Sequence, residues 1–339
     1  MNIAELLELP RLEDDLFRVE TQLRQAVTSE DPFLTEVARH LVDAGGKRIR
    51  PALTVAAATV ETAQGDLGPA SLPPSGDGPA AAPFVMGGVS VELVHVGSLC
   101  HDDVIDEART RRGVDTVNAR WGNLIAILAG DFLLARASEI AAELGTEVAG
   151  LLAATIARLC QGQTLEVQAA YDVKRSETSY LAAIAGKTAS LMSAACRIGA
   201  LTSGQDRDRV DALTAFGHAF GMAFQICDDI LDLVGTDETL GKPAGLDLVA
   251  GVYTLPVIRA LADAETGPEL RPLLGGPVDP ADRDRARDLV RCSPALALSV
   301  ADARVWADQA GEALGGLPGP VSAQLAQLGH RLIDALPFT

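Results

Sequence analysis

Two acidic clusters contain the side chains of this chain that are best suited to chemistry. They are Asp102, Asp103 and Asp106 in HDDVID, and Asp228, Asp229 and Asp232 in CDDILD. At 100° per residue, the first and last aspartates of HDDVID lie about 40° apart around a helix, so they share one face. Both clusters continue apolar runs, where carboxylates cost stability unless they are paired or bind a metal. We therefore expect positive groups between the clusters.

The ligand types of these clusters indicate Mg²⁺. Carboxylate oxygens without accompanying histidine or thiolate ligands suit this hard cation, which keeps several waters and bridges to substrate phosphates. The alternative is that each cluster is a solvated helix end, which is the common explanation of a single DDxxD motif. The second copy and the apolar flanks favour the metal site.

Basic residues elsewhere could bind the phosphates that such ions would bridge. GGKRIRP, residues 45–51, sets two glycines and three cations at a predicted loop-to-helix junction, where backbone N–H groups and arginine forks can grip phosphate oxygens. Arg111 and Arg112 form a second basic pair just after HDDVID. Lys187 in AGKTAS and Lys242 in LGKP are single lysines, for which an exposed surface position is the alternative.

Helices must position these groups, because apolar residues recur with a period of 3.6 over most of the chain. No segment alternates convincingly with the period of two that marks a strand. We expect helices over 3–27, 31–43, 48–62, 84–107, 120–143, 147–171, 177–203 and 206–235. The predicted fold class is all-α, a bundle of about ten or more helices in a single domain, 1–339.

Residues 63–83 interrupt the helical pattern. This segment is rich in glycine, proline and small residues, so we expect a long, flexible surface loop. A domain boundary is the alternative, but only about 60 residues precede the segment, too few for a comfortable independent core.

Composition and charge exclude several classes of protein. The 46 acidic against 28 basic residues, a net charge of −18, leave no surplus of cations for general nucleic-acid binding. The five cysteines form no CxxC pair, which is typical of buried, reduced thiols. The chain begins without the basic and apolar regions of a signal peptide, and no uninterrupted apolar run of about 18 residues occurs. We expect a cytoplasmic protein without a transmembrane segment.

Taken in order, six segments resemble the motifs of the trans-isoprenyl diphosphate synthases, the polyprenyl synthetase family. They are GGKRIRP, HDDVIDEARTRRG, GDFLLARA, GKTAS, FQICDDILD and TLGKP. The resemblance implies an isoprenoid synthase-type helical bundle around a central cavity, two aspartate-rich helices that face each other, and a homodimer. The implied reaction is the Mg²⁺-dependent head-to-tail (1'-4) condensation of isopentenyl diphosphate with an allylic diphosphate, with three Mg²⁺ ions expected when diphosphate is bound and transient membrane contact for product release.

The resemblance also implies a role for each matching residue. Those implied to bind Mg²⁺ on the allylic diphosphate are Asp102, Asp106 and Asp228, supported through water or hydrogen bonds by Asp103, Asp229 and Asp232. Those implied to hold the allylic diphosphate are Arg111, Lys187 and Lys242. Those implied to hold isopentenyl diphosphate are Lys47, Arg50, His95 and Arg112. The residues whose oxygens would face the developing carbocation are Thr188 and Gln225.

Product length is expected to depend on Ser98 and Gly97, four and five positions before the first aspartate. Members of the resembled family with bulky aromatics there stop at short products. One helical turn, about 5.4 Å, is similar to one extended isoprene unit, so small residues on successive turns would leave a deepening tunnel. Gly87, Gly88 and Ser90 are also small, so we expect a product of roughly C30 to C50. The alternative is that the small residues are close helix contacts.

One departure from the family pattern and several rival functions remain. Val252 in GVYTLP stands where the family often has lysine, which removes one phosphate or water-network contact. A shorter-chain synthase making geranylgeranyl or farnesyl diphosphate is the nearest alternative. A class I terpene cyclase would not need GGKRIRP, and an inactive partner subunit would have lost its aspartates. A di-iron bundle would need two Glu-x-x-His pairs, and only Glu92 and His95 form one.

Overall fold

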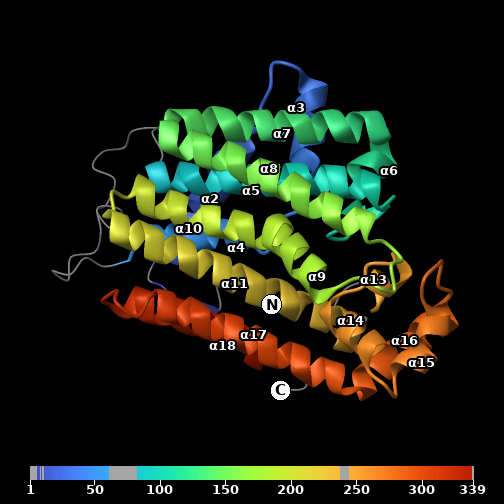
Figure 1. The fold of residues 1–339 in the computed structure, drawn as a ribbon. Coiled ribbons are helices and arrows are strands. Elements are labelled where there is room, and N and C mark those ends of the chain that lie inside the picture. The colour runs from blue at the N-terminus through green and yellow to red at the C-terminus, as the bar shows by residue number, and fades with distance from the viewer. Residues whose placement is uncertain (1–5, 8, 10, 61–81, 237–243, 338–339) are drawn as a thin grey trace. The chain divides into compact units, whose positions relative to one another are not determined.

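The computed structural model describes residues 6, 7, 9, 11–60, 82–236 and 244–337 (Figure 1). The described residues belong to two compact units, each made of three stretches of sequence. The first unit comprises 1–156, 191–217 and 313–325, and the second comprises 157–190, 218–312 and 326–339. The single domain expected for 1–339 stays a prediction.

Helix α5 (Pro83–Ile105) is the core helix of the first unit. Its neighbours α2, α4, α6 and α7 all contact it. The other elements of this unit are α2 (Leu12–Ala26), α3 (Pro32–Asp43), α4 (Ile49–Ala58), β1 (Thr110–Arg111), β2 (Val114–Asp115), α6 (Val117–Trp121) and α7 (Asn123–Glu143). Local signals set several boundaries: Asp31 caps α3 by accepting the Phe33 N–H at 2.9 Å, and Pro32 occupies its first position.

The second unit contains shorter helices around the C-terminal half of α11. Its elements are α9 (Glu177–Ile184), the π-helix η2 (Ala185–Ala189), α13 (Leu246–Val249), α14 (Leu255–Ala262), α15 (Gly267–Leu270), the 3₁₀-helix η3 (Arg271–Leu273) and α16 (Pro280–Cys292). Ser176 caps α9 through the Ser179 N–H, and Asp279 caps α16 through two N–H groups. The helices with residues in both units are α8 (Thr146–Gln168), α10 (Ser190–Thr202), α11 (Arg207–Val234), α17 (Pro294–Ala313) and α18 (Pro320–Asp334).

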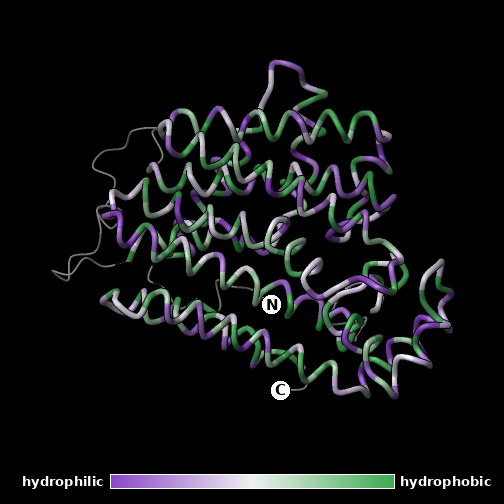
Figure 2. The backbone as a smooth tube through the Cα atoms, in the orientation of Figure 1, coloured by the Kyte–Doolittle hydropathy of each residue, from purple (hydrophilic) through white to green (hydrophobic). Residues whose placement is uncertain are grey.

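The all-α prediction is confirmed in the described part of the chain, where the only strands are the two-residue β1 and β2. Figure 2 shows hydrophobic and hydrophilic residues interspersed along the helices of the described chain. Three predictions were wrong in detail. The helix expected over 3–27 begins at Leu12 after the non-helical residues 7, 9 and 11, and the helix expected over 120–143 is interrupted at Gly122, between α6 and α7. The single helix expected over 177–203 is divided into α9, η2 and α10. The predicted loop at 63–83 lies outside the described residues except for its last two positions.

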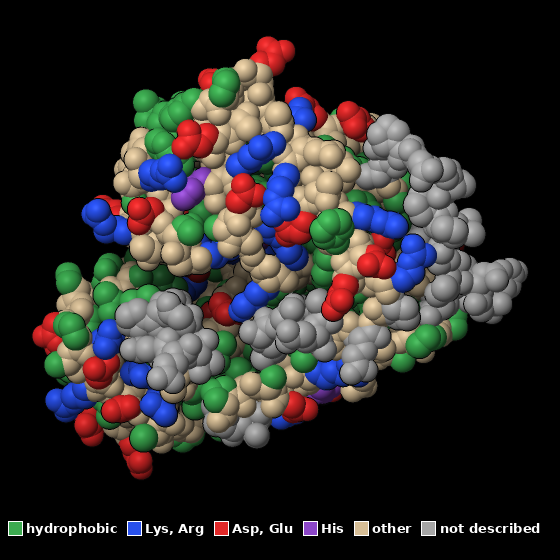
Figure 3. Space-filling view, turned by 180° about the vertical axis from the view of Figure 1, so that it is seen from behind, with side chains coloured by type: hydrophobic (Ala, Val, Ile, Leu, Met, Phe, Trp, Pro, Cys, Tyr) green, Lys and Arg blue, Asp and Glu red, His purple; other side chains and the backbone are tan. Residues whose placement is uncertain are grey.

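One described helix, α5, is long and apolar enough to cross a membrane by length and composition alone. However, most of α5 is buried inside the structure, as in the core helix of a globular unit. On the face shown in Figure 3, basic side chains are interspersed with acidic ones among the residues drawn in colour.

Candidate active site

Helix α5 presents the first acidic motif at its C-terminal end. The helix ends at Ile105, and Asp106 follows as its cap, with its backbone N–H bonded to the carbonyl oxygen of Asp102 at 2.8 Å. Asp102 is half-buried and Asp106 is exposed. These carboxylates therefore lie one helical turn apart at a helix end that a ligand can reach.

Asp103, the middle aspartate of this motif, has a different environment. Its side chain is fully buried, and Oδ1 accepts a hydrogen bond from Arg111 Nε at 2.7 Å. Burial raises the pKa of Asp103, and the Arg111 charge opposes that effect. Asp103 thus orients Arg111 in this structure, and its role toward Mg²⁺ stays a prediction.

A β-hairpin after α5 positions the two arginines. Arg111 pairs with Val114, and the two residues between them, Arg112 and Gly113, both have positive φ, 53° and 79°. This is the pattern of a two-residue hairpin turn of the type that matches strand twist. The turn directs Arg111 toward Asp103 and Arg112 toward the glycine loop before α4.

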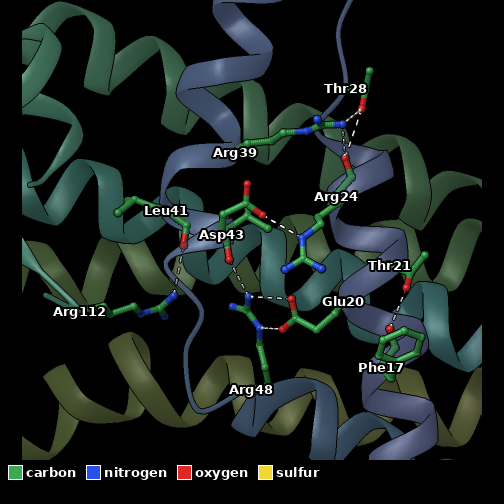
Figure 4. Close-up of polar contacts among 11 residues, drawn as sticks. Phe17, Glu20, Thr21, Arg24, Thr28, Arg39, Leu41, Asp43, Arg48 and Arg112 are labelled. Carbon is green, nitrogen blue, oxygen red and sulfur yellow. Dashed lines mark hydrogen bonds and ion pairs between the residues drawn. The ribbon is translucent and has the colours of Figure 1, made fainter. Parts of the chain in front are cut away.

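Arg112 holds that glycine loop in place. Its Nη1 donates to the carbonyl oxygens of Gly45 and Leu41, the second shown in Figure 4. Gly46 has φ +152° and lies directly against the guanidinium, where an added Cβ would be 2.7 Å from Arg112 Cζ. Glycine at 46 therefore lets the loop pass close to the arginine, whereas glycine at 45 suits the positive φ of +77° there.

Arg48 ties the same loop to the core of the unit (Figure 4). Only 7% exposed and in the left-handed conformation, it donates to both carboxylate oxygens of Glu20 on α2. It also donates to Glu92 on α5 at 2.8 Å and to the carbonyl oxygen of Val42 at 2.9 Å. The structural role of Arg48 was not predicted from the sequence, although this residue lies inside GGKRIRP. The signal that could have revealed it is Glu92, a carboxylate within the apolar run of α5 that needs a counter-charge.

The first unit brings together most of the predicted isopentenyl diphosphate residues. Burial and the neighbouring Arg112 lower the pKa of Arg50, whose buried Nε has no hydrogen-bond partner among the described residues. Burial and the charges of Arg50 and Arg112 lower the pKa of His95 well below its ordinary value. Glu92, the carboxylate that opposes this charge, is already bound by Arg48. The cluster is therefore electropositive and has an orphan donor, as an anion site requires.

Lys47 is the remaining predicted member of this group. Its side chain is exposed, and it lies close to Arg50 in the sequence. No contact of its side chain is needed to place the loop, which Arg48 and Arg112 hold. The role of Lys47 in substrate binding stays a prediction.

The second acidic motif lies on the part of α11 that belongs to the second unit. Asp228 is exposed, whereas Asp229 and Asp232 are 5% and 4% exposed. Asp229 accepts hydrogen bonds from Tyr180 Oη at 2.5 Å and from Gln225 Nε2 at 2.7 Å. Burial raises the pKa of Asp229 to about 7 although both hydrogen bonds lower it. Asp228 is therefore the member of this motif placed for direct ligand contact.

Asp232 holds the segment that follows α11. Its Oδ2 accepts the backbone N–H of Asp247 at 3.3 Å, and its carbonyl oxygen accepts that of Gly245 at 2.9 Å. Val252, where the family often has lysine, donates its own N–H to the Asp247 carbonyl at 2.8 Å. Lys242 lies outside the described residues, so its predicted role is untested.

The π-helix η2 contains Lys187 and Thr188. Its wider turn lies against α8, where a Cβ on Gly162 would be 2.7 Å from the Ala183 carbonyl oxygen and would collide with the Lys187 backbone nitrogen. Single π turns of this kind occur frequently at functional sites. Lys187 Nζ pairs with Glu166 Oε1 at 2.5 Å, and the Thr188 hydroxyl donates to Gln225 Oε1 at 2.6 Å.

The small residues of α5 are largely helix contacts. A Cβ on Gly87 would lie 2.7 Å from Cγ2 of Ile198, and one on Gly88 would lie 3.5 Å from Pro51 Cα. A Cβ on Gly97 would lie 3.1 Å from the carbonyl oxygen of Gly130 on α7. Gly87 and Gly97 therefore allow close packing against neighbouring helices, whereas a methyl group at Gly88 would make only ordinary contacts. The chain-length role expected for Gly97 and Ser98 stays a prediction. Ser98 is half-buried, and its hydroxyl bonds only its own helix, at His95 O.

The residues present fit Mg²⁺ by their donor chemistry. Asp102, Asp106 and Asp228 offer carboxylate oxygens that are at least partly accessible, which suits a hard cation that also takes water and phosphate oxygens. Among the described residues, no three His, Cys, Asp or Glu side chains form a ready-made metal cage. The two motifs belong to different units, so their predicted facing arrangement stays a prediction.

Comparison with known proteins agrees with the acidic motifs and the basic cluster described above. Residues 31–292 match the family model described as Polyprenyl synthetase. The chain is 40% identical over 304 residues to a nonaprenyl diphosphate synthase of Mycobacterium tuberculosis, covering 88% of this chain and 84% of the relative. It is 41% identical over 308 residues to heptaprenyl diphosphate synthase component 2 of Geobacillus stearothermophilus, covering 91% of each.

A solved structure matches the fold over nearly the whole chain. The polyprenyl synthase of Caulobacter crescentus, in complex with calcium and isoprenyl diphosphate, superimposes with a TM-score of 0.84 at 33% identity, covering 96% of this chain and 97% of that one. The family model, the identities and the all-helical structure lead to one assignment. The chain belongs to the polyprenyl synthetase family and is an all-α transferase of the prenyltransferase class.

Proposed function

We propose that the protein condenses isopentenyl diphosphate with an allylic diphosphate, head to tail, to give a trans-polyprenyl diphosphate of roughly C30 to C50, a range expected if Ser98, and not a bulky aromatic residue, borders the growing chain. The observation that carries this proposal is the electropositive cluster of Arg50, Arg112 and His95, with its orphan Arg50 Nε, in the same unit as Asp102 and Asp106. The names of the hepta- and nonaprenyl relatives support a long product.

Each group would act as a binding, orienting or charge-stabilising element. Arg50, Arg112, His95 and Lys47 would hold isopentenyl diphosphate, while Arg111, oriented by Asp103, would bind the allylic diphosphate. Asp102 and Asp106 in the first unit, and Asp228 in the second, would hold Mg²⁺, with three ions expected in all, and the metal would supply positive charge that favours departure of the diphosphate. The calcium and isoprenyl diphosphate in the Caulobacter structure support this ligand chemistry.

The second unit would supply the remaining contacts. Lys187 and Lys242 would also hold the allylic diphosphate, and the oxygens of Thr188 and Gln225 would stabilise the carbocation. The double bond of isopentenyl diphosphate then attacks the cation, and the proton that is lost goes to the departed diphosphate. Fixed dipoles cost no reorganisation during the reaction, which is why oriented side-chain oxygens suffice without a nucleophile.

The decisive experiment is elongation by the purified chain alone. The protein is incubated with Mg²⁺, labelled isopentenyl diphosphate and allylic primers of increasing length, and products are resolved by chain length. Mg²⁺-dependent formation of long-chain products is expected. Failure to elongate any primer would overturn the assignment, and a cyclised hydrocarbon made without isopentenyl diphosphate would favour the terpene cyclase.

Ser98→Phe is expected to shorten the products. Ser98 is half-buried and its hydroxyl bonds its own helix, so we expect a phenyl group there to extend toward the growing chain, whereas a side chain at Gly97 would first have to displace α7. The measurement is the distribution of product lengths from one primer. The matched control is Ser138→Phe on α7, because the exposed Ser138 also bonds only its own helix, at Leu134 O. Equal distributions for both variants and the wild type would contradict the tunnel assignment.

We also propose that α7 forms a homodimer contact. Leu124, Ile127 and Leu128, spaced as one helix face, are 70%, 42% and 51% exposed. Leu128→Lys is expected to convert a dimer to monomer in analytical ultracentrifugation, because a charge would be buried at the contact. Leu298→Lys on α17, where the leucine is 55% exposed, is the control and should remain dimeric. A monomeric wild type would disprove the contact.

A further inference from the structure

A continuous chain of hydrogen bonds runs through the second unit to Gln225 and Thr188. The Thr188 hydroxyl donates to Gln225 Oε1 at 2.6 Å, and Gln225 Nε2 donates to Asp229 Oδ1 at 2.7 Å. The other oxygen of Asp229, Oδ2, accepts from the hydroxyl of Tyr180 at 2.5 Å. Tyr180 on α9 is 1% exposed, and neither the sequence motifs nor the proposed mechanism uses it.

The order of donors and acceptors determines which way Gln225 points. Its amide has an acceptor oxygen and a donor nitrogen that could exchange places by rotation. Asp229 binds the amide nitrogen, so the amide oxygen must lie toward Thr188. This holds only while the Asp229 carboxylate keeps its orientation, and Tyr180 is the described side chain that binds its second oxygen.

We propose that Tyr180 is a positioning residue, which acts through Asp229 to direct the Gln225 and Thr188 oxygens toward the carbocation. The inference rests on the proposed function, because those oxygens matter only if an allylic cation forms. Tyr180 needs no contact with the substrate. Its contribution is to keep the dipoles aligned before ionisation, so that they need no reorientation when charge develops.

Arg175 packs over the face of the Tyr180 ring. Its guanidinium carbon lies 5.5 Å from the centre of that ring, and its Nη1 donates to the carbonyl oxygen of Tyr253 at 2.9 Å. Arg175 is itself only 6% exposed, so the cation and the ring are held together in a buried site. The ring position is therefore determined independently of the Asp229 hydrogen bond, and phenylalanine at 180 should keep it.

Tyr180→Phe tests the proposal because it removes only the hydroxyl group. We expect kcat to fall by about 10- to 100-fold, the usual effect of losing such an orienting partner, with both KM values nearly unchanged. We expect kcat to change without KM because the groups that bind the diphosphates are untouched, whereas stabilisation of the charge in the transition state is weakened. A variant that is only less stable, with wild-type kcat at a temperature where it is folded, would overturn the proposal.

Tyr253→Phe is the matched control. Tyr253 is also fully buried in the second unit, and its hydroxyl accepts one hydrogen bond, from the Gly275 N–H at 2.6 Å. Its loss should lower the melting temperature in the same way without lowering kcat. If both phenylalanine variants lowered kcat equally, the effect would be general destabilisation and the proposal would fail.

A double-mutant cycle tests whether Tyr180 acts through Gln225. In a Gln225→Met background, which already lacks the oriented amide, Tyr180→Phe should cause no further fall in kcat. Full additivity of the two effects would show that Tyr180 acts elsewhere. Failure of the proposed function would be distinguishable from failure of the Tyr180 proposal, because the wild type itself would then show no Mg²⁺-dependent elongation.

Discussion

Asp228→Asn is expected to lower kcat by about 10³-fold, in the range found when one electrostatic stabiliser of a transition state is removed. The side chain is exposed and the replacement is isosteric, so the free energy of unfolding should change little. What is lost is a negative charge at the position best placed in CDDILD to hold Mg²⁺ on the leaving diphosphate. Asp102→Asn in HDDVID should act in the same way.

Two measurements separate metal binding from folding. Steady-state elongation gives kcat, and thermal denaturation with and without Mg²⁺ plus inorganic diphosphate gives the shift that ligand binding adds to the folded state. The wild type should gain melting temperature, and Asp228→Asn should lose most of that gain. Asp288→Asn on α16, with its side chain 73% exposed, should behave as the wild type in both assays. A full ligand-induced shift in the Asp228 variant would refute the assignment.

Arg48→Met is expected to destabilise the protein by about 3–5 kcal/mol, the usual cost of removing one partner from a buried ion pair. The arginine side chain is 6% exposed, and the change would leave Glu92, at 2% exposure, without its counter-charge. Native proteins have only about 5–15 kcal/mol of stability, so this is a large fraction. The same change should raise the KM for isopentenyl diphosphate, because the loop that places Lys47 and Arg50 loses its attachment to α2 and α5.

Arg24→Met is the control for this prediction. Arg24 pairs with Asp43 at 2.8 Å, but both side chains are about half exposed, 52% and 50%. Water already solvates these charges, so the loss of the pair should change stability far less than the loss of Arg48. Urea denaturation followed by circular dichroism measures both variants. Equal midpoints for the two arginine variants would contradict the proposed role of the buried network.

The helical boundaries follow local rules, and most of them could be predicted. The start of α3 at Pro32 and the end of α5 at Ile105 agree closely with the predicted helices, because caps, proline and apolar period act within a few residues. The division of 177–203 could not be predicted in this way. The π turn at Lys187 is supported by the close approach of Gly162 from α8, which is a tertiary contact.

Residue size alone did not predict which positions of α5 are open. An added Cβ would lie 2.7 Å from Ile198 at Gly87 and 3.1 Å from Gly130 at Gly97, both tight contacts, whereas at Gly88 the nearest atom, in Pro51, would be at an ordinary 3.5 Å. A tunnel and a tight helix crossing both select small residues, so the sequence pattern cannot distinguish them. Only the positions of the neighbouring helices decide which explanation holds at each residue.

By itself the sequence determined the chemistry of this protein: hard carboxylates in two DDxxD motifs, a GGKRIRP cation cluster and an all-helical chain to carry them. Those features depend on residue type and short-range spacing, which are read directly from the chain. The tertiary structure decided which members of each group remain available to a ligand. Asp103 and Asp229 are directed inward to Arg111 and Tyr180, and Arg48 holds the glycine loop, because a buried charge or polar group must find a partner wherever the fold places one.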